Sequence, residues 1–252
     1  NTSFADIEKK ENRKDLIISI CVFLSGFSCF AQLYYFQPLL PDLAKDFILS
    51  ASESSFAISF STLGMVFGLF TTMFVADRIP RKKMIGTGLL SSSIFSVAAS
   101  FSPTFLPLIL LSAAKGFLLS GATSVSMAYI AEEVSSRNKG KIMGLYIAGN
   151  ALGGMAGRVI SSWIGALYTW RIASVSIGLI CALFAILFLL FSPRSTNFMP
   201  RKESFHTLII ANLQLITSKA LIPFYLTGGL ILGVFVSLYN YLGFYLTKAP
   251  FN

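Results

Sequence analysis

Charged residues are scarce in this sequence. Only 12% of its 252 residues are Asp, Glu, Lys or Arg, about half the fraction expected of a soluble globular protein. Hydrophobic residues make up 54%, 24 residues are phenylalanine, and the mean hydropathy is +0.71. This sequence has too few polar residues to cover the surface of a water-soluble fold of its size. The composition therefore excludes a free aqueous domain and indicates a protein that lies in lipid.

Residues that carry most hydrolytic and metal chemistry are also nearly missing. The single histidine, His206, leaves no pair that could hold zinc, and no His-Glu-x-x-His pattern occurs. Neither a Gly-x-Ser-x-Gly nucleophile turn nor a phosphate-binding Gly-x-x-x-x-Gly-Lys-Ser/Thr loop is present. Cys21, Cys29 and Cys181 lie in apolar stretches, where small packing residues are expected instead of disulfides. The sequence predicts no enzyme, no metal and no cofactor.

Seven apolar runs are long enough to cross the hydrocarbon core of a bilayer, which needs about 20 helical residues. Runs this long and continuous favour helices over the short alternating strands of a membrane barrel. They cover residues 16–40, 56–76, 84–101, 105–131, 142–167, 172–191 and 221–246. The predicted fold is an all-α membrane protein with about seven transmembrane helices.

The runs divide the chain into four segments. These are a tail, a six-helix bundle, a linker and a seventh helix that begins a second bundle, over residues 1–15, 16–191, 192–220 and 221–252. A mixed polar and apolar stretch of the linker, residues 206–216, predicts a helix along the inner face of the membrane. The first run lacks a small-residue cleavage site, so we expect a retained span and not a removed signal peptide.

Lysine and arginine lie mostly on one side of the predicted helices. Alternate connections hold 15 of them, while the opposite connections hold 3. Because loops that face the cytoplasm are enriched in these residues, the tail, the linker and the basic loops are predicted to be cytoplasmic. Basic loops also anchor helices at lipid headgroups, so the net charge of +9 implies no nucleic-acid partner.

Polar side chains recur along one face of the first, fourth and seventh predicted helices, which indicates the walls of a wet cavity. Gln32 and Tyr35 belong to the first face, Lys115 to the second and Asn240 to the third. Lys115, and Arg158 on the fifth helix, are predicted near mid-membrane, where a charge costs about 3 kcal/mol and faces a cavity or a partner. No Asp or Glu is predicted at that depth. We expect all five to serve substrate binding or proton coupling; for the two cations, snorkelling or a structural ion pair is the alternative.

Glycines spaced four residues apart predict two close helix contacts. Gly64 and Gly68 form one row, and Gly149, Gly153 and Gly157 form another. Small residues at this spacing let neighbouring backbones approach closely in a membrane. The two rows occupy equivalent helices in successive groups of three, which indicates an inverted 3+3 repeat of the kind found in secondary transporters.

Three motifs, taken in order along the chain, resemble motifs of the major facilitator superfamily. The first is the loop 74–83, which is similar to the family signature Gly-x-x-x-Asp-Arg-x-Gly-Arg-Lys. Met73 and Pro80 stand in place of its two glycines. The charged positions that match are Asp77, Arg78, Arg81 and Lys82. By this resemblance these four residues belong to a cytoplasmic gate.

The second and third motifs lie on the fourth and fifth predicted helices. Residues 111–117 are similar to a family motif with arginine at the position of Lys115, which implies a role there in substrate or proton coupling. Residues 149–154 are similar to the Gly-Pro-x-x-Gly-Gly motif of the family's antiporters, with Asn150 in place of proline. The resemblance implies that Asn150 and Gly154 join the glycine row of this helix in packing.

Members of this family usually have twelve helices in two halves, with the substrate site between the halves. The resemblance covers residues 16–248, which correspond to the N-terminal half and about one helix more. It implies a multi-pass protein of the bacterial inner membrane, of the efflux type. We expect the chain to be a fragment or a truncated product, whose C-terminal half is a covalent continuation or a separate chain.

The sequence predicts a proton-coupled secondary transporter that exports a small molecule by alternating access. Its expected partners are a small-molecule substrate, protons and the lipid bilayer. Two alternatives stay open. The two buried cations favour a uniporter or importer of a small anion. The missing helices favour a truncated membrane protein that does not transport.

Overall fold

The computed structural model describes residues 4–200, 209–210 and 214–246, and every regular element within them is helical. The long helices are α1 (Phe4–Tyr34), α4 (Phe56–Val75), α5 (Arg81–Ser100), α6 (Phe105–Glu133), α7 (Lys139–Leu167), α8 (Trp170–Phe191) and α10 (Ile222–Leu246). The short elements are η1 (Gln37–Leu39), α2 (Leu40–Asp46), α3 (Ala51–Ser54) and η2 (Ala76–Arg78). The predicted all-α membrane fold is confirmed.

The first predicted helix differs from the observed one at both ends. α1 begins at Phe4, inside the predicted tail, and ends at Tyr34, six residues before the predicted end at residue 40. Pro38 and Pro41 explain the early end, because proline lacks an N–H for the helix ladder. Each proline instead opens a new short helix, η1 and then α2. The break turns Gln37 into the interior, where it is 1% exposed.

Each of the seven predicted runs corresponds to one long helix, but within the described residues five segments have both the length and the hydropathy to cross a membrane. These are Lys9–Asp46, Ala51–Arg78, Phe105–Glu133, Trp170–Phe191 and Ile222–Leu242. α5 and α7 are not among them, since α5 opens with three basic residues and contains five serines, and α7 carries two lysines and an arginine. The count of seven spans stays a prediction.

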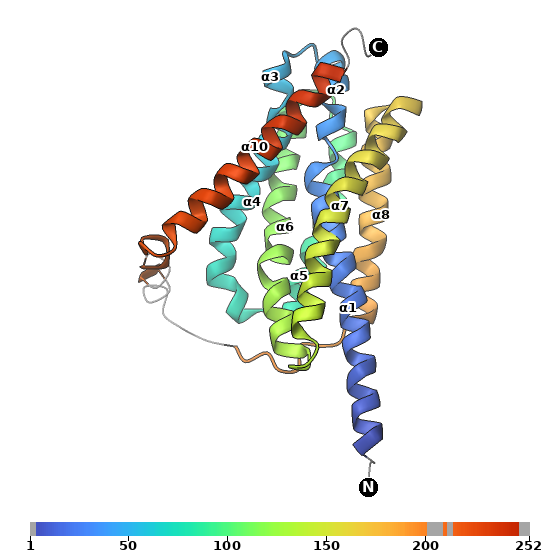
Figure 1. Ribbon diagram of the computed structural model, residues 1–252. Helices are drawn as coiled ribbons and strands as arrows, with labels where there is room; N and C mark the ends of the chain where they lie inside the picture. The colour runs from blue at the N-terminus through green and yellow to red at the C-terminus, as the bar shows by residue number, and fades with distance from the viewer. Residues whose placement is uncertain (1–3, 201–208, 211–213, 247–252) are drawn as a thin grey trace.

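α1 and α4 to α8 lie side by side in one bundle, and α10 crosses it obliquely on one side (Figure 1). α1 packs on α7, α4 on α6, and α5 between α6 and α8. The first helix of each predicted group of three thus packs on the second helix of the other group. This exchange is the contact pattern that the predicted repeat requires, although the repeat itself stays a prediction. α10 reaches the bundle through η1 and α2.

The segment 192–200 runs beneath the ends of the bundle helices, from α8 towards the base of α10 (Figure 1). Tyr129 near the end of α6 holds its start, because the phenol bonds both to the Ser192 hydroxyl and to the Pro193 carbonyl at 2.8 Å. The helix predicted over residues 206–216 lies largely outside the described residues. Residues 209–210 and 214–216 are helical.

Candidate functional site

Lys115 of α6 lies inside the bundle and is 1% exposed. Its ammonium group lies 4.5 Å from the ring centre of Tyr35 and 4.9 Å from that of Phe36. Its Nζ has no hydrogen-bond partner among the described residues, and they supply it with no ion pair either. A cation on two aromatic faces gains about 2 kcal/mol when desolvated, which offsets only part of its burial cost. Neither snorkelling nor a carboxylate pair accounts for this lysine.

Further polar atoms around Lys115 lack partners. The Ser28 and Ser112 hydroxyls and the Gln32 amide nitrogen are buried and make no hydrogen bond among the described residues. Other atoms of the same cluster do have hydrogen-bond partners. Ser96 donates to the side-chain oxygen of Gln32 at 3.2 Å, and the Tyr35 phenol bonds to the Ser174 hydroxyl at 2.8 Å. The structure therefore brings the predicted Gln32, Tyr35 and Lys115 together in one buried polar cluster that holds unused donors.

Arg158 of α7 occupies a second place, between α1, α7 and α10. Its Nε donates to the Gln37 side chain at 2.5 Å, and its Nη1 donates to the Gly154 carbonyl at 2.9 Å. Gln37 in turn donates its amide to Asn240 of α10 at 2.9 Å. The predicted Arg158 and Asn240 thus meet through a glutamine that the sequence analysis missed, because the proline break brings Gln37 inward.

Aromatic rings surround the Arg158 guanidinium. Its carbon lies 4.6 Å from the ring centre of Tyr34, 4.5 Å from that of Tyr239 and 5.6 Å from that of Phe235. The Nη2 atom is buried and has no partner among the described residues. Beside it lies a pocket of 530 Å³, a size typical of small-molecule sites. The sequence analysis missed these three rings, although Phe235 and Tyr239 are four residues apart and so share a helical face.

At one end of the bundle, residues 76–80, 134–138 and 192–200 form what we call the basic end. Arg81, the first residue of α5, adjoins the basic end and has a side chain that is 9% exposed. It donates to Asp77 at 2.9 Å, to the Ala76 carbonyl at 2.5 Å and to Glu132 of α6 at 3.1 and 3.2 Å. The structure thus brings the predicted Asp77 and Arg81 together and adds Glu132, whose second oxygen has no partner among the described residues.

The other two residues of the predicted gate motif lie apart from that ion network. Arg78 is exposed, whereas Lys82 donates through its Nζ to the Ser192 carbonyl and through its backbone N–H to Ser195 at 3.0 Å. The turn in this loop is a short 3-10 helix, and Pro80 follows it with φ −53° and ψ 131°. No described residue of the loop has a positive φ. The loop therefore forms without the family's two glycines.

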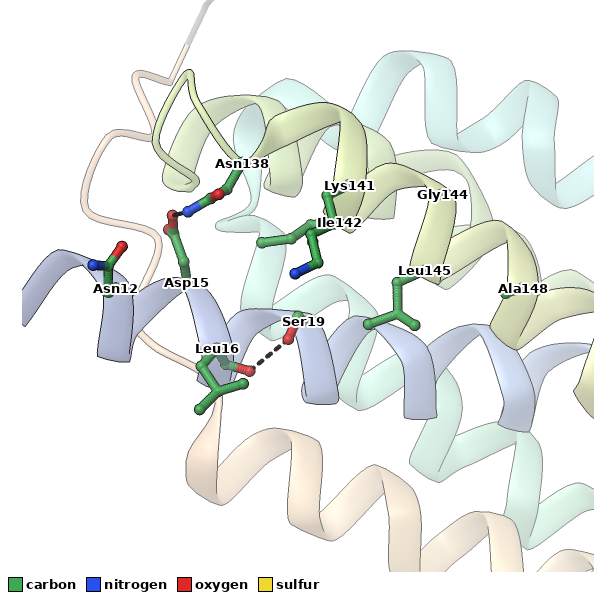
Figure 2. Close-up of a pocket in the computed structure, with 10 residues that line it drawn as sticks. All are labelled: Asn12, Asp15, Leu16, Ser19, Asn138, Lys141, Ile142, Gly144, Leu145 and Ala148. Carbon is green, nitrogen blue, oxygen red and sulfur yellow. Dashed lines mark hydrogen bonds between the residues drawn. The ribbon is translucent and has the colours of Figure 1, made fainter.

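Two acidic residues join α1 to the same end. Glu133 pairs with Lys14 at 2.8 Å and accepts from the Asn197 backbone at 2.7 Å. Asp15, 3% exposed, accepts from Ser135 at 2.5 Å and from Asn138 at 2.8 Å. Figure 2 shows Asp15 pointing to Asn138 at the edge of a 550 Å³ pocket between α1 and α7. These bonds tie α1 to the ends of α6 and α7.

The predicted glycine rows lie at the two closest helix contacts. A Cβ built on Gly64 would lie 2.0 Å from the Ala113 carbonyl oxygen of α6, and one on Gly68 would lie 2.4 Å from that of Phe117. On α7, a Cβ on Gly149, Gly153 or Gly157 would lie 2.6, 2.2 or 2.7 Å from the nearest backbone atom of α1. Backbone atoms cannot move aside as side chains can, so these positions have room for hydrogen only.

The last two predicted packing residues have different surroundings. A Cβ on Gly154 would make only ordinary van der Waals contacts, the nearest of them to Arg158. The Gly154 carbonyl accepts a hydrogen bond from Nη1 of the same arginine. Asn150 faces α1, and its side-chain oxygen would lie 2.3 Å from a Cβ on Gly26. That oxygen has no hydrogen-bond partner among the described residues. Both residues line the pocket beside Arg158.

Comparison with known proteins gives a match along nearly the whole chain. The family model described as Major Facilitator Superfamily matches residues 19–251. An uncharacterized transporter of Buchnera aphidicola subsp. Schizaphis graminum is 35% identical over 97% of this chain and 59% of its own length. The inner membrane transport protein YnfM of Escherichia coli K12 is 35% identical over 93% of this chain and 56% of its own length. The chain thus spans little more than half of these relatives.

A solved structure shares the fold. It is the crystal structure of a bacterial homologue of the human lysosomal transporter Spinster, in an inward-facing and unoccupied conformation. The two align with a TM-score of 0.74 and 14% sequence identity, over 95% of this chain and 56% of that one. At this identity the likeness establishes the arrangement of the helices and nothing about the substrate.

Proposed function

Because the chain belongs to the major facilitator superfamily, a family of membrane transporters, we propose that it is part of a secondary active transporter that exports a small solute in exchange for protons. We assign it to the bacterial inner membrane, where the related YnfM is named as a transport protein. Export is supported by the similarity of residues 149–154 to the antiporter motif of the family. The chain belongs to a transporter family and is not an enzyme.

The observation that carries proton coupling is the buried amine of Lys115. A charged amine that is buried in the bundle, with no acceptor among the described residues, is costly. The ammonium form is therefore favoured when a counter-charge is near and the amine form when it is absent. Lysine can change charge in this way, whereas arginine stays protonated. Arrival and departure of a proton at Lys115 can therefore bias the bundle between two states, which is the requirement for coupled transport.

The network at the basic end supports a gate. Arg81 connects the loop before α5 to α6 through Asp77 and Glu132, and Lys82 connects α5 to the segment 192–200. We assign this end to the cytoplasm on the 15 to 3 distribution of lysine and arginine. In the proposed cycle these bonds form in one state and open in the other, so that access to the site alternates between the two sides.

A second candidate function is uniport or import of a small anion. Lys115 and Arg158 are cations in the interior, and no described carboxylate pairs with either. A transported anion would supply the missing counter-charge without a proton. This candidate differs from the first in its response to a pH gradient, which makes the two separable by experiment.

Everted membrane vesicles from cells that produce the protein test the proposal. Respiration acidifies the vesicle interior, which quenches acridine orange. A panel of anionic, neutral and cationic solutes is then added, with vesicles that lack the protein as control. Proton-coupled export predicts that at least one solute restores fluorescence only in the protein-containing vesicles.

Uptake of labelled solute that is unchanged when the pH gradient is collapsed would contradict proton coupling and favour the uniporter. If these 252 residues move no solute while a longer protein containing them does, transport belongs to the longer protein and the chain alone is the non-transporting alternative.

A further inference from the structure

Among the described residues, three of the five N–H groups of Arg158 have no acceptor. Nε–H bonds to Gln37 and one Nη1–H bonds to the Gly154 carbonyl, which leaves one N–H on Nη1 and two on Nη2. The Nη2 atom is buried and unpartnered among the described residues. A buried charged donor left without an acceptor costs more than a neutral one, so this arrangement favours a bound group that accepts from it.

The pocket beside these free N–H groups has no acidic residue. Twelve described residues line it, and the only charged one among them is Arg158. A neutral or cationic solute would leave the guanidinium charge uncompensated, whereas a single negative charge would balance it. A planar carboxylate can accept two N–H bonds of a guanidinium at once, in the forked geometry that arginine prefers.

The rest of the pocket is apolar and largely aromatic. Phe30, Tyr34, Phe235 and Tyr239 supply rings, and Ile147, Met155, Val159 and Leu232 supply aliphatic surface. Such walls bind an apolar body, and aromatic side chains favour a flat ring that can lie against their faces or edges. Methionine adapts to different shapes, so the body can vary while the charged end stays fixed.

We propose that this pocket binds a monocarboxylate with an aromatic body, its carboxylate on the free N–H groups of Arg158 and its ring among the side chains of α1, α7 and α10. This substrate class rests on the proposed transport function, since it identifies the solute of that same site. It adds a prediction that transport alone does not make, namely equilibrium binding without any gradient.

Benzoate is the probe for this site. The 252-residue chain is purified into lipid nanodiscs, and binding is followed by isothermal titration calorimetry with no ion gradient. Benzamide has the same shape without the charge, benzylamine has the opposite charge, and acetate has the charge without the ring. We expect benzoate to bind saturably and at least tenfold more tightly than each of the other three.

Arg158→Gln should weaken benzoate binding at least tenfold, while Arg158→Lys should keep the preference for benzoate over benzamide at lower affinity. Arg171→Gln is the matched control. Arg171 also lies over aromatic rings, Trp170 and Phe47, but outside this pocket and paired with Asp46 at 3.0 Å. Its replacement should leave benzoate binding unchanged.

Tyr239→Ala gives a second variant if Arg158→Gln does not fold. Tyr239 is 37% exposed on α10, so its truncation leaves the bundle interior intact. It should weaken benzoate binding but leave that of acetate unchanged, because it removes ring contacts and keeps the charge.

Absence of saturable benzoate binding, equal affinity for benzamide, or unchanged benzoate binding in Arg158→Gln would each overturn the inference. These results are separable from those for transport. Proton-coupled movement of a neutral or cationic solute would leave the proposed function standing while this substrate class fails. If benzoate binds but its movement does not respond to a pH gradient, the substrate class stands while proton coupling fails.

Discussion

At the scale of single residues, the glycines of α7 differ sharply in what surrounds them. A Cβ on Gly153 would lie 2.2 Å from the Phe27 carbonyl oxygen and 2.5 Å from its Cα, whereas a Cβ on Gly144 meets nothing within 4 Å. Gly153→Ala should therefore push α1 and α7 apart and destabilise the fold by about 1–3 kcal/mol, the usual cost of overpacking.

Gly144→Ala, in the same helix, is the control and should be neutral or slightly stabilising, because alanine favours a helix more than glycine does. Thermal unfolding of the two variants in detergent, followed by size-exclusion elution, checks the difference. Equal melting temperatures would show that the α1–α7 contact is looser than described.

Spacing along the sequence predicts which residues share a helix face, but it does not predict what the face meets. It therefore indicates one face with Gln32 and Tyr35 and another with Lys115, and the structure brings these two faces together. The partner of Arg158, Gln37, was missed since it follows the helix break and its direction depends on the two prolines. Glu132 was not singled out from the sequence, because its bond to Arg81 depends on how α5 packs on α6.

At the scale of elements, Arg81 holds the loop between α4 and α5 to α6. Arg81→Gln removes the cation that Glu132 and Asp77 share, and should lower stability by about 2 kcal/mol, less than for a fully buried pair because both carboxylates are partly exposed. Lys83→Gln, an exposed neighbour, should change stability by less than about 0.5 kcal/mol.

Asp77→Asn should behave differently from Arg81→Gln. The side chain of Asp77 is 44% exposed and the amide keeps an oxygen for Arg81, so folded protein should persist. Transport should fall, because the charge that balances the two states of the gate is lost. Rates of solute movement at matched amounts of folded protein decide this. A normal rate in Asp77→Asn would remove Asp77 from the gate.

At the scale of the whole molecule, the proposed orientation in the membrane rests on the distribution of lysine and arginine. Ser136 lies at the basic end and Thr104 at the opposite end, and both residues are exposed. Each is replaced by cysteine for labelling. The three native cysteines are buried, which keeps background labelling low. An impermeant maleimide should label Thr104→Cys from outside intact cells and Ser136→Cys only in everted vesicles. The reverse pattern would overturn the orientation and with it the cytoplasmic gate.

The overall architecture was within reach of the sequence, since long apolar runs in lipid have few alternatives to helices. Two of the seven predicted spans stay predictions. α5 and α7 were predicted as spans, but their serines, glycines and charges leave them short of the hydropathy that the other helices have. Helices that are enclosed by neighbours can carry such residues, and enclosure depends on pairings such as α1 with α7 that no single run reveals.

The central claim is that the protein couples solute movement to protons through Lys115. The direct measurement is solute flux in proteoliposomes with and without an imposed pH gradient, using a solute found in the everted-vesicle panel and comparing wild type with Lys115→Arg. Lys45→Arg, at an exposed position, is the control. The account predicts that the gradient accelerates flux in wild type and Lys45→Arg but has no effect in Lys115→Arg, because a guanidinium keeps its proton. Flux in Lys115→Arg that responds to the gradient as wild type does would contradict it.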